Sequence, residues 1–384
     1  MTSAPRIYLD NNATTPVASE CIAAMTMCLQ DFYGNPSSKH SIGEAAKTQT
    51  LTARAQVAAA MGASPAEIVF TSGGSEAIHQ AIYGALALAP DKRRIVTTQV
   101  EHSATLMPLK SLETQGYEVV YLPVNRTGQL DLQALEQAVT TETALLTLMW
   151  ANNETGVLFP IEQATALAAF KGVLIHVDAV QAFGKLPIDL KQVPVDFLSL
   201  SGHKLHAPKG VGALFVRKGR KIPPLLFGHQ ERGRRGGTEN VPAIAALGVA
   251  AELAAGGLAA QEARIAGMRD RLEKALLAKL PQASITGAGA PRLAGTSSLN
   301  LGGVIEAEIV LDKLDKAGIC ASAGAACSAG GSEPSHVMLA MGLTPEEVLS
   351  TIRLSLSRYT TDAEIDRVIS VLPSVVETAL AEAA

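Results

Sequence analysis

Short apolar runs alternate with amphipathic segments from about residue 66 onward, and this alternation constrains the fold more than any other feature. The runs are rich in Val, Ile and Leu and include EIVFT, RRIVTTQ, YEVVYLP, TALLTLMW, VLIHVD, DFLSLS and GALFVRK. Several are separated by segments whose apolar residues have helical spacing. This pattern is typical of a mostly parallel sheet that helices cover on both faces. We therefore predict an α/β fold.

The pattern changes near residue 240. The Ala-rich stretch NVPAIAALGVAAELAAGGLAAQEARIAGMRDRLEKALLAKL predicts long helix interrupted at Gly256–Gly257. Short strands are then expected in ASITG, TSSLNLG and GICAS, and helices over 306–318, 346–358 and 363–383. Together these segments indicate a second, smaller α/β domain.

Composition and charge limit the partners that this chain can have. Hydrophobic residues make up 47%, which is ample for a large core, and the net charge of −4 gives no sign of direct nucleic-acid binding. The N-terminus lacks a basic segment followed by an apolar run, and no uninterrupted apolar stretch of about 18 residues occurs. The four cysteines form no CxxC pair. We therefore expect a cytoplasmic protein with no membrane span and no metal site.

Polar residues follow one predicted strand after another. Ligands of open α/β sheets lie at the carboxyl ends of the strands, so these residues should share one edge. They are Ser72, Gly73, Gly74, Ser75, Glu76, Glu101, His102, Asn152, Asn153, Glu154, Asp178, Gln181, His203 and Lys204. A single crevice for a cofactor or substrate explains this arrangement.

The turn TSGGSEA joins a strand to the start of a helix, where backbone N–H groups and the helix dipole can hold a phosphate. An ordinary capped turn is the alternative. The GxxxxGK of a triphosphate-binding loop is missing, so a nucleoside triphosphate is not expected.

Three further residues have chemistry that suits one cofactor. Asp178 follows an apolar strand and could pair with a protonated ring nitrogen or cap the next segment. Lys204 lies between apolar runs, where loss of solvent would favour its nucleophilic form, although a lone lysine there is more often on the surface. His102 could stack on a ring, move protons or occupy a loop. A carboxylate, a lysine and a phosphate turn are what pyridoxal phosphate requires.

The chain resembles the pyridoxal-phosphate cysteine desulfurases of the NifS/IscS type, which have fold type I and fall in the class V aminotransferase group. The resemblance runs nearly end to end through YLDNNATTPV, FYGNPSSKHSIG, EIVFTSGGSEA, ANNETG, HVDAVQAFGKLPIDL, LSLSGHKLHAPKGVGAL, QERGRRGGTENVP, SSLNLGG, SEPSHVMLAMG and IRLSLSRYTT. It implies a large cofactor-binding domain over 16–258 and a small C-terminal domain over 259–384. Residues 1–15 would form an N-terminal arm that packs with the small domain.

The resemblance also implies roles for single residues around pyridoxal phosphate. Lys204 would form a Schiff base with it, Asp178 would pair with its ring nitrogen, and Gln181 with its phenolic oxygen. His102 would stack on the ring and act as acid or base. The cofactor phosphate would be bound by Gly74, Ser75, Ser201 and His203 of one subunit and by Thr238 of its neighbour, so a homodimer is implied.

The substrate implied by the resemblance is L-cysteine. Asn153 would contact the cofactor and, with Arg353, hold the substrate carboxylate. Cys327 would take the sulfur as a persulfide, L-alanine would leave, and the sulfur would pass to an acceptor protein such as an iron–sulfur scaffold. In the family the nucleophilic cysteine usually ends the sequence SGSAC. Here that sequence is AGAAC, which removes hydroxyls near Cys327.

Two other functions are compatible with these residues. A selenocysteine lyase or a related aminotransferase would use the same cofactor, although an aminotransferase has no need for Cys327. A non-catalytic relative acting as a partner subunit or regulator would not need Lys204, Asp178, His102 and Cys327 together.

Overall fold

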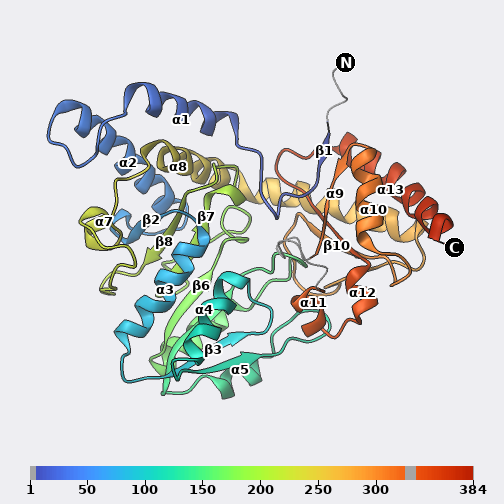
Figure 1. The fold of residues 1–384 in the computed structure, drawn as a ribbon, viewed down its shortest axis with the longest axis horizontal. Coiled ribbons are helices and arrows are strands. Elements are labelled where there is room, and N and C mark those ends of the chain that lie inside the picture. Colours follow the sequence, from blue (N-terminus) through green and yellow to red (C-terminus); the bar gives the residue numbers. More distant parts are fainter. Residues whose placement is uncertain (1–5, 325–333, 384) are drawn as a thin grey trace.

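The largest feature of the computed structural model, which describes residues 6–324 and 334–383, is a seven-stranded sheet (Figure 1). In spatial order its strands are β2 (Ile68–Thr71), β8 (Gly212–Val216), β7 (Phe197–Ser201), β6 (Leu174–Asp178), β5 (Thr143–Met149), β3 (Arg94–Thr98) and β4 (Glu118–Leu122). Neighbours from β7 to β4 run parallel, whereas β8 is antiparallel to both of its neighbours. This confirms the predicted mostly parallel α/β sheet.

Helices cover both faces of this sheet, and whole strands are therefore buried. Successive strand residues point to opposite faces. Leu145 of β5 packs in a cluster with α3 (Gly74–Leu88) and α4 (Ser103–Glu113), whereas Leu146 packs in a cluster with α6 (Ile161–Lys171) and α8 (Val241–Ala255). This half also contains α1 (Ser19–Asp31), α2 (Ser41–Ala59), α5 (Leu132–Ala138), α7 (Gln230–Gly233) and the 3-10 turns η1 (Pro65–Glu67) and η2 (Gly202–Lys204).

A four-stranded antiparallel sheet with its own hydrophobic cluster forms the C-terminal part. Its order is β12 (Ser322–Ala323), β13 (Thr351–Ser355), β10 (Thr296–Asn300) and β9 (Ser284–Ile285). The accompanying helices are α9 (Leu258–Lys279), α10 (Ala307–Lys316), α11 (His336–Ala340), α12 (Pro345–Leu349) and α13 (Asp362–Ala383). Leu299 and Ile352 pair across this sheet and share a cluster with Leu272 of α9 and Val368 of α13.

The helix predicted over residues 346–358 is wrong. Helix α12 ends at Leu349, and the following residues form β13, buried at every position between β10 and β12. Ile352 and Leu354 join the hydrophobic cluster, whereas Arg353 between them lines a cavity, as the alternation of a strand requires. Pairing with two distant strands outweighs the local helical pattern, and it brings Arg353 to the site described below.

The N-terminal segment runs between the two sheets. Strand β1 (Ile7–Tyr8) pairs in parallel with β11 (Ile319–Cys320), and Asp10 forms a β-bridge with Ser355. A few residues later, the Thr15 N–H donates to the His203 carbonyl at 3.0 Å, beside the large sheet. Residues 10–15 therefore contact both parts of the molecule.

Helices α8 and α9 lie on either side of the break expected at Gly256–Gly257. The boundaries drawn there and after residue 15 remain a prediction, with the two separate clusters as the proposed cores. Within the described ranges no single helix is long and apolar enough to cross a membrane. In the same ranges one pair, α8 and α9 taken together, passes that test, with a bend of 75° between the two helices.

Candidate active site

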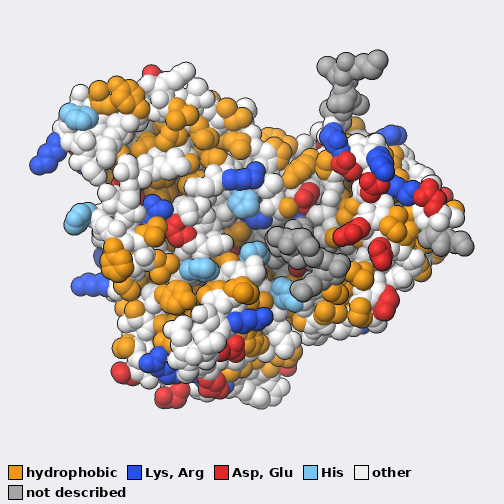
Figure 2. Space-filling model, in the orientation of Figure 1, with side chains coloured by type: hydrophobic (Ala, Val, Ile, Leu, Met, Phe, Trp, Pro, Cys, Tyr) orange, Lys and Arg blue, Asp and Glu red, His pale blue; other side chains and the backbone are white. Residues whose placement is uncertain are grey.

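A cavity of about 200 Å³ lies at the carboxyl edge of the large sheet. The predicted site residues that line it are Gly74, Ser75, His102, Asn153, Asp178, Gln181, Ser201, His203, Lys204 and Arg353. Figure 2 shows histidine side chains gathered on the face between the two parts of the molecule. Thr238 is exposed and lies away from the lining, and Cys327 lies outside the described residues. The individual roles of these residues stay predictions.

Asp178 ends β6 and points its carboxylate at the cavity. Burial raises its pKa to about 6, although the Val180 N–H, 2.9 Å from Oδ1, and the charge of Lys204 lower it. A buried carboxylate gains most from a cationic partner. A protonated ring nitrogen in the cavity would supply one.

Lys204 lies on η2, directly after β7. Its Nζ donates to the backbone carbonyls of Asn12 at 2.6 Å and Ala13 at 2.8 Å. Both acceptors belong to the N-terminal segment, 192 and 191 residues away in sequence. The amine is thus held at the cavity by backbone groups that the strand pattern did not identify.

Helix α3 begins at Gly74, where its backbone closely approaches two neighbouring segments. A Cβ on Gly74 would lie 2.8 Å from Val180 Cγ2 and 3.3 Å from Ser201 Cβ. Gly74, Ser75 and Ser201 all line the cavity, so the start of this 15-residue helix and two hydroxyl side chains form part of its wall. This donor set suits an anion such as a phosphate monoester.

Two histidines at the cavity are held neutral. His102 caps α4 by accepting the Ala104 N–H at Nδ1, at 3.0 Å. Burial lowers its pKa, and Lys204 and His336 add to the effect. Burial and Lys204 lower the pKa of His203 to about 4. Since Nδ1 of His102 is an acceptor, its neutral ring carries the proton on Nε2.

Arg353 reaches the cavity from β13 and is 2% exposed. Its Nη2 donates to Asp10 Oδ1 at 2.9 Å and to Ser322 Oγ at 2.8 Å, and its Nη1 donates to the Asn153 carbonyl at 3.0 Å. Within the described part of the chain its Nε has no hydrogen-bond partner. A buried guanidinium with an unused donor suits a carboxylate ligand.

The strand pattern assigned no role to Asn12, which lines the cavity, or to Ser335. Asn12 is buried, and Glu154, which was expected at this edge, is buried with its pKa raised to about 7 by the loss of solvent. Ser335 Oγ donates to Glu154 Oε2 at 2.5 Å. The run DNNATTP was a usable signal, because polar residues in a segment without helix or strand pattern need partners elsewhere.

The groups around the cavity fit pyridoxal phosphate. Lys204 can bind its carbonyl carbon, Asp178 can pair with its ring nitrogen, and the start of α3 can hold its phosphate. Gly74 has no side chain that could cover the first helix N–H groups, and its close approach to Val180 leaves no room for one. The residues present thus match the chemical parts of this cofactor.

The fold and the site together define a fold type I transferase. The sequence matches the family described as aminotransferase class-V over residues 7–368. A cysteine desulfurase of Trichormus azollae is 54% identical over 97% of this chain and 93% of its own. A solved NifS-like protein superposes with a TM-score of 0.90 at 36% identity, covering 97% of this chain and all (100%) of that one. The chain belongs to the class V aminotransferase family, among its NifS-type cysteine desulfurases.

One further solved relative is described as SspA in complex with cysteine. It has a TM-score of 0.80 at 35% identity and covers 92% of this chain and 100% of its own.

Proposed function

We propose that this protein uses pyridoxal phosphate to remove sulfur from L-cysteine, with L-alanine as the other product. The observation that carries the proposal is the convergence of Lys204, Asp178 and the N-terminus of α3 on one cavity. Full-length relatives named cysteine desulfurase, and the similar structure described with cysteine, support this substrate.

Residues from four strand ends would hold the cofactor. Asp178 would face the ring nitrogen, where a positive charge keeps the carboxylate ionised below its raised pKa of about 6. Gln181 would contact the phenolic oxygen, and the neutral ring of His102 would lie against the cofactor ring. Gly74, Ser75, Ser201 and His203 would bind the phosphate.

Lys204 would carry the proton in the central step. When bound, pyridoxal phosphate supplies a conjugated ring that stabilises negative charge at the substrate Cα. Lys204 Nζ removes the Cα proton, and the carbonyls of Asn12 and Ala13, at 2.6 and 2.8 Å, hold the resulting ammonium. Two backbone acceptors favour the charged amine, so they stabilise the lysine after it has taken the proton.

Arg353 would hold the carboxylate of L-cysteine, with Asn153 beside it. The guanidinium is fixed by Asp10, Ser322 and the Asn153 carbonyl, so it loses little conformational freedom when the substrate binds. This fixed cation would orient the substrate with its Cα toward Lys204, since both side chains line the same cavity.

Cys327 would accept the sulfur. Its thiolate attacks the substrate sulfur, a new S–S bond forms, and the C–S bond of the substrate breaks with its electron pair left on Cβ. That carbon is then protonated, so one L-cysteine and one thiol give one L-alanine and one enzyme persulfide. The proposal for Cys327 rests on the family resemblance, because this residue lies outside the described ranges.

The assembly and the fate of the sulfur belong to the same proposal. The exposed position of Thr238 agrees with a contact to the phosphate of a second subunit, and hence with a homodimer. The persulfide would pass to an acceptor protein such as an iron–sulfur scaffold in the cytoplasm.

The test uses the purified holoenzyme with L-cysteine and a thiol reductant, measuring alanine and sulfide. Wild type should release both in equal amounts, and the Cys327→Ala variant should bind the cofactor but release neither. Cys320→Ala is the matched control, since Cys320 lies on β11 away from the cavity lining. Full sulfide release by C327A would overturn the role of Cys327. Amino transfer to a 2-oxo acid without sulfide would identify an aminotransferase, and activity confined to L-selenocysteine a selenocysteine lyase.

A further inference from the structure

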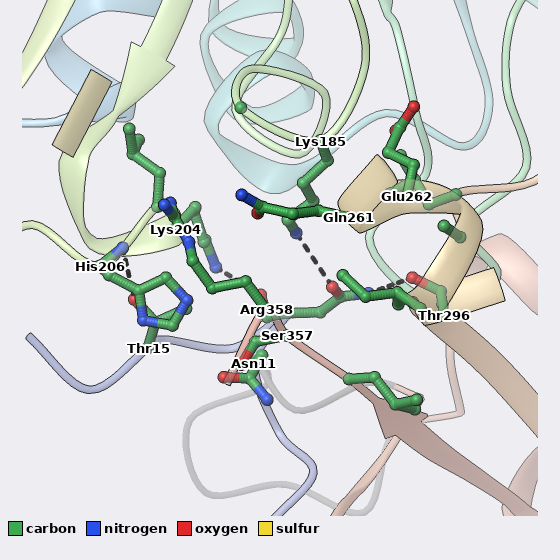
Figure 3. Close-up of a pocket in the computed structure, with 18 of the residues that line it drawn as sticks. Asn11, Thr15, Lys185, Lys204, His206, Gln261, Glu262, Thr296, Ser357 and Arg358 are labelled. Atoms are coloured by element: carbon green, nitrogen blue, oxygen red, sulfur yellow. Dashed lines mark hydrogen bonds between the residues drawn. The ribbon is translucent and has the colours of Figure 1, made fainter. Parts of the chain in front are cut away.

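Lys185 is a second lysine beside Lys204 that the proposed reaction does not use. It lines a small cavity of about 60 Å³, next to the substrate cavity, between the large sheet and helix α9 (Figure 3). Asn12 and Lys204 line both cavities. Both lysines therefore contact the segment that holds Lys204 in place.

The ammonium of Lys185 contacts two side chains at once. Its Nζ donates to Gln181 Oε1 at 2.8 Å and to Asn12 Oδ1 at 3.2 Å. Figure 3 shows Lys185 and Thr296 at the two ends of successive hydrogen bonds, and the side chain between them is Asn12, whose Nδ2 donates to Thr296 Oγ1 at 2.9 Å. Lys185 is thus tied to β10 of the second sheet through one asparagine.

These contacts determine which way the Gln181 amide points. The ammonium form of Lys185 can only donate, so it meets the oxygen of the amide, and Nε2 is left as the donor end. That Nε2 donates to the Asn12 carbonyl at 3.0 Å, and the same carbonyl accepts Lys204 Nζ at 2.6 Å. Lys185, Gln181 and Asn12 form a closed ring of hydrogen bonds with Lys204 attached to it.

We propose that Lys185 is a positioning residue. Its hydrogen bonds fix the Gln181 amide and the Asn12 carbonyl, and they thereby orient the two groups that face the cofactor, Gln181 Nε2 and Lys204 Nζ. The part that concerns Gln181 and the cofactor rests on the proposed function. The ring of hydrogen bonds leaves Gln181 Nε2 available to a phenolic oxygen and keeps the acceptor of Lys204 in one place. Lys185 itself does not line the substrate cavity, so its proposed action on the cofactor is indirect.

The charges around Lys185 agree with this role. Burial and, to a lesser degree, the nearby cations Lys204 and Arg353 together lower its pKa to about 7. The other titratable or charged groups lining the small cavity are His206, Arg358 and Glu262. An amine donates hydrogen bonds whether or not it is protonated, so the ring persists in both forms.

The test compares Lys185→Met with wild type and with Lys191→Met, a matched control at an exposed lysine. The holoenzyme is titrated without substrate, following the visible absorbance of the bound cofactor. In K185M the site loses a cation, and the Gln181 amide is no longer held as a donor to the cofactor. Both changes favour the protonated form of the cofactor bound to Lys204. The pH midpoint in K185M should therefore rise by about half a unit or more. Lys185→Arg keeps a charged donor, and the neighbouring cavity has room for it, so K185R should restore the midpoint.

A second measurement needs no cofactor. In protein stripped of it, hydrogen exchange at the N–H groups of Asn12 and Ala13 should be faster in K185M by about tenfold, the effect of losing roughly 1.4 kcal/mol of local hydrogen bonding. K191M should match wild type in both measurements. If K185M does not fold, Lys185→Gln, with a shorter neutral donor, replaces it.

An unchanged midpoint in K185M overturns the proposal, even if exchange is faster, because Lys185 would then only stabilise the fold. A raised midpoint that K185R does not restore also overturns it. Alanine release is measured in wild type alone. Its absence would refute the proposed function, while the midpoint and exchange would still decide the role of Lys185.

Discussion

Glu101 shows how burial alone can set the charge of a side chain. Its Oε1 accepts hydrogen bonds from Thr98 Oγ1 at 2.8 Å and from the Met149 N–H at 3.1 Å, while Oε2 has no partner in the described part of the protein. Burial, with a smaller effect of the Asp178 charge, raises its pKa to about 8 although those two hydrogen bonds lower it. Near neutral pH the group is therefore an uncharged carboxylic acid directly before His102.

This raised pKa predicts how stability depends on pH. The unfolded carboxyl loses its proton near pH 4.5, whereas the folded one keeps it to about pH 8, so the folded state binds more protons between these values. The stabilisation that Glu101 provides is thus complete below pH 4.5 and is lost as the pH rises to 8. Measured by urea unfolding, wild type should lose stability relative to Glu101→Gln over this window by several kcal/mol.

Above pH 8 the stabilities of wild type and E101Q should change in parallel, because Glu101 is then ionised in both the folded and the unfolded protein. Glu118→Gln, at an exposed carboxylate, is the matched control and should follow wild type throughout. A constant difference between wild type and E101Q from pH 5 to pH 8 would show that the Glu101 carboxyl is ionised in the folded protein.

At the scale of an element, the start of α3 depends on the absence of a side chain at Gly74. An added Cβ would lie 2.8 Å from Val180 Cγ2, closer than atoms pack, so the first turn of the helix and Val180 must move apart. Since this turn offers its N–H groups to the proposed phosphate, the shift should weaken cofactor binding more than it weakens the fold.

Gly74→Ala should raise the dissociation constant for pyridoxal phosphate by about tenfold or more, equivalent to about 1.4 kcal/mol. The measurement is reconstitution of stripped protein followed by absorbance. Gly267→Ala in α9 is the control, because a Cβ there meets nothing within 4 Å. It should leave cofactor affinity unchanged and raise stability by about 0.5–1 kcal/mol. Equal affinities of G74A and wild type for pyridoxal phosphate would show that the start of α3 does not bind the phosphate.

The strands of the large sheet could be predicted because their signal is local. Runs such as Thr143–Met149 are buried on both faces, so they are apolar throughout. Strand β13 could not be predicted in the same way, because Thr351–Ser355 continues the pattern of α12 and becomes a strand only through its pairing with β10 and β12. Tertiary contacts overrode the local pattern there.

At the scale of the whole molecule, the site depends on the segment around Asn12. The carboxyl-edge rule could place Asp178, Lys204 and His102 near one another from sequence, since it needs only strand order. It could not place Asn12, because several of its partners lie 141 to 284 residues away, and it could not bring Lys185 to Asn12 across 173 residues. Nothing in the local sequence encodes such separations.

Arg353 connects the two sheets of the molecule and is also the proposed ligand of the substrate carboxylate. One guanidinium joins Asp10 of the N-terminal segment, Ser322 of β12 and Asn153 of the large sheet's edge, so it fixes the second sheet against the first. A lysine would keep the charge but lose the planar fork and the free Nε. Arg353→Lys should therefore weaken the proposed hold on the substrate carboxylate.

The KM of R353K for L-cysteine should rise by about tenfold or more, the effect of losing a bidentate charged contact worth roughly 1.4 kcal/mol or more. The cofactor absorbance should persist, because Arg353 is not among its proposed ligands. Arg271→Lys is the matched control, at an exposed ion pair with Asp362 outside the cavity lining. It should leave KM unchanged. A normal KM in R353K would place the carboxylate site elsewhere in the cavity and leave Arg353 as a clamp between the two sheets.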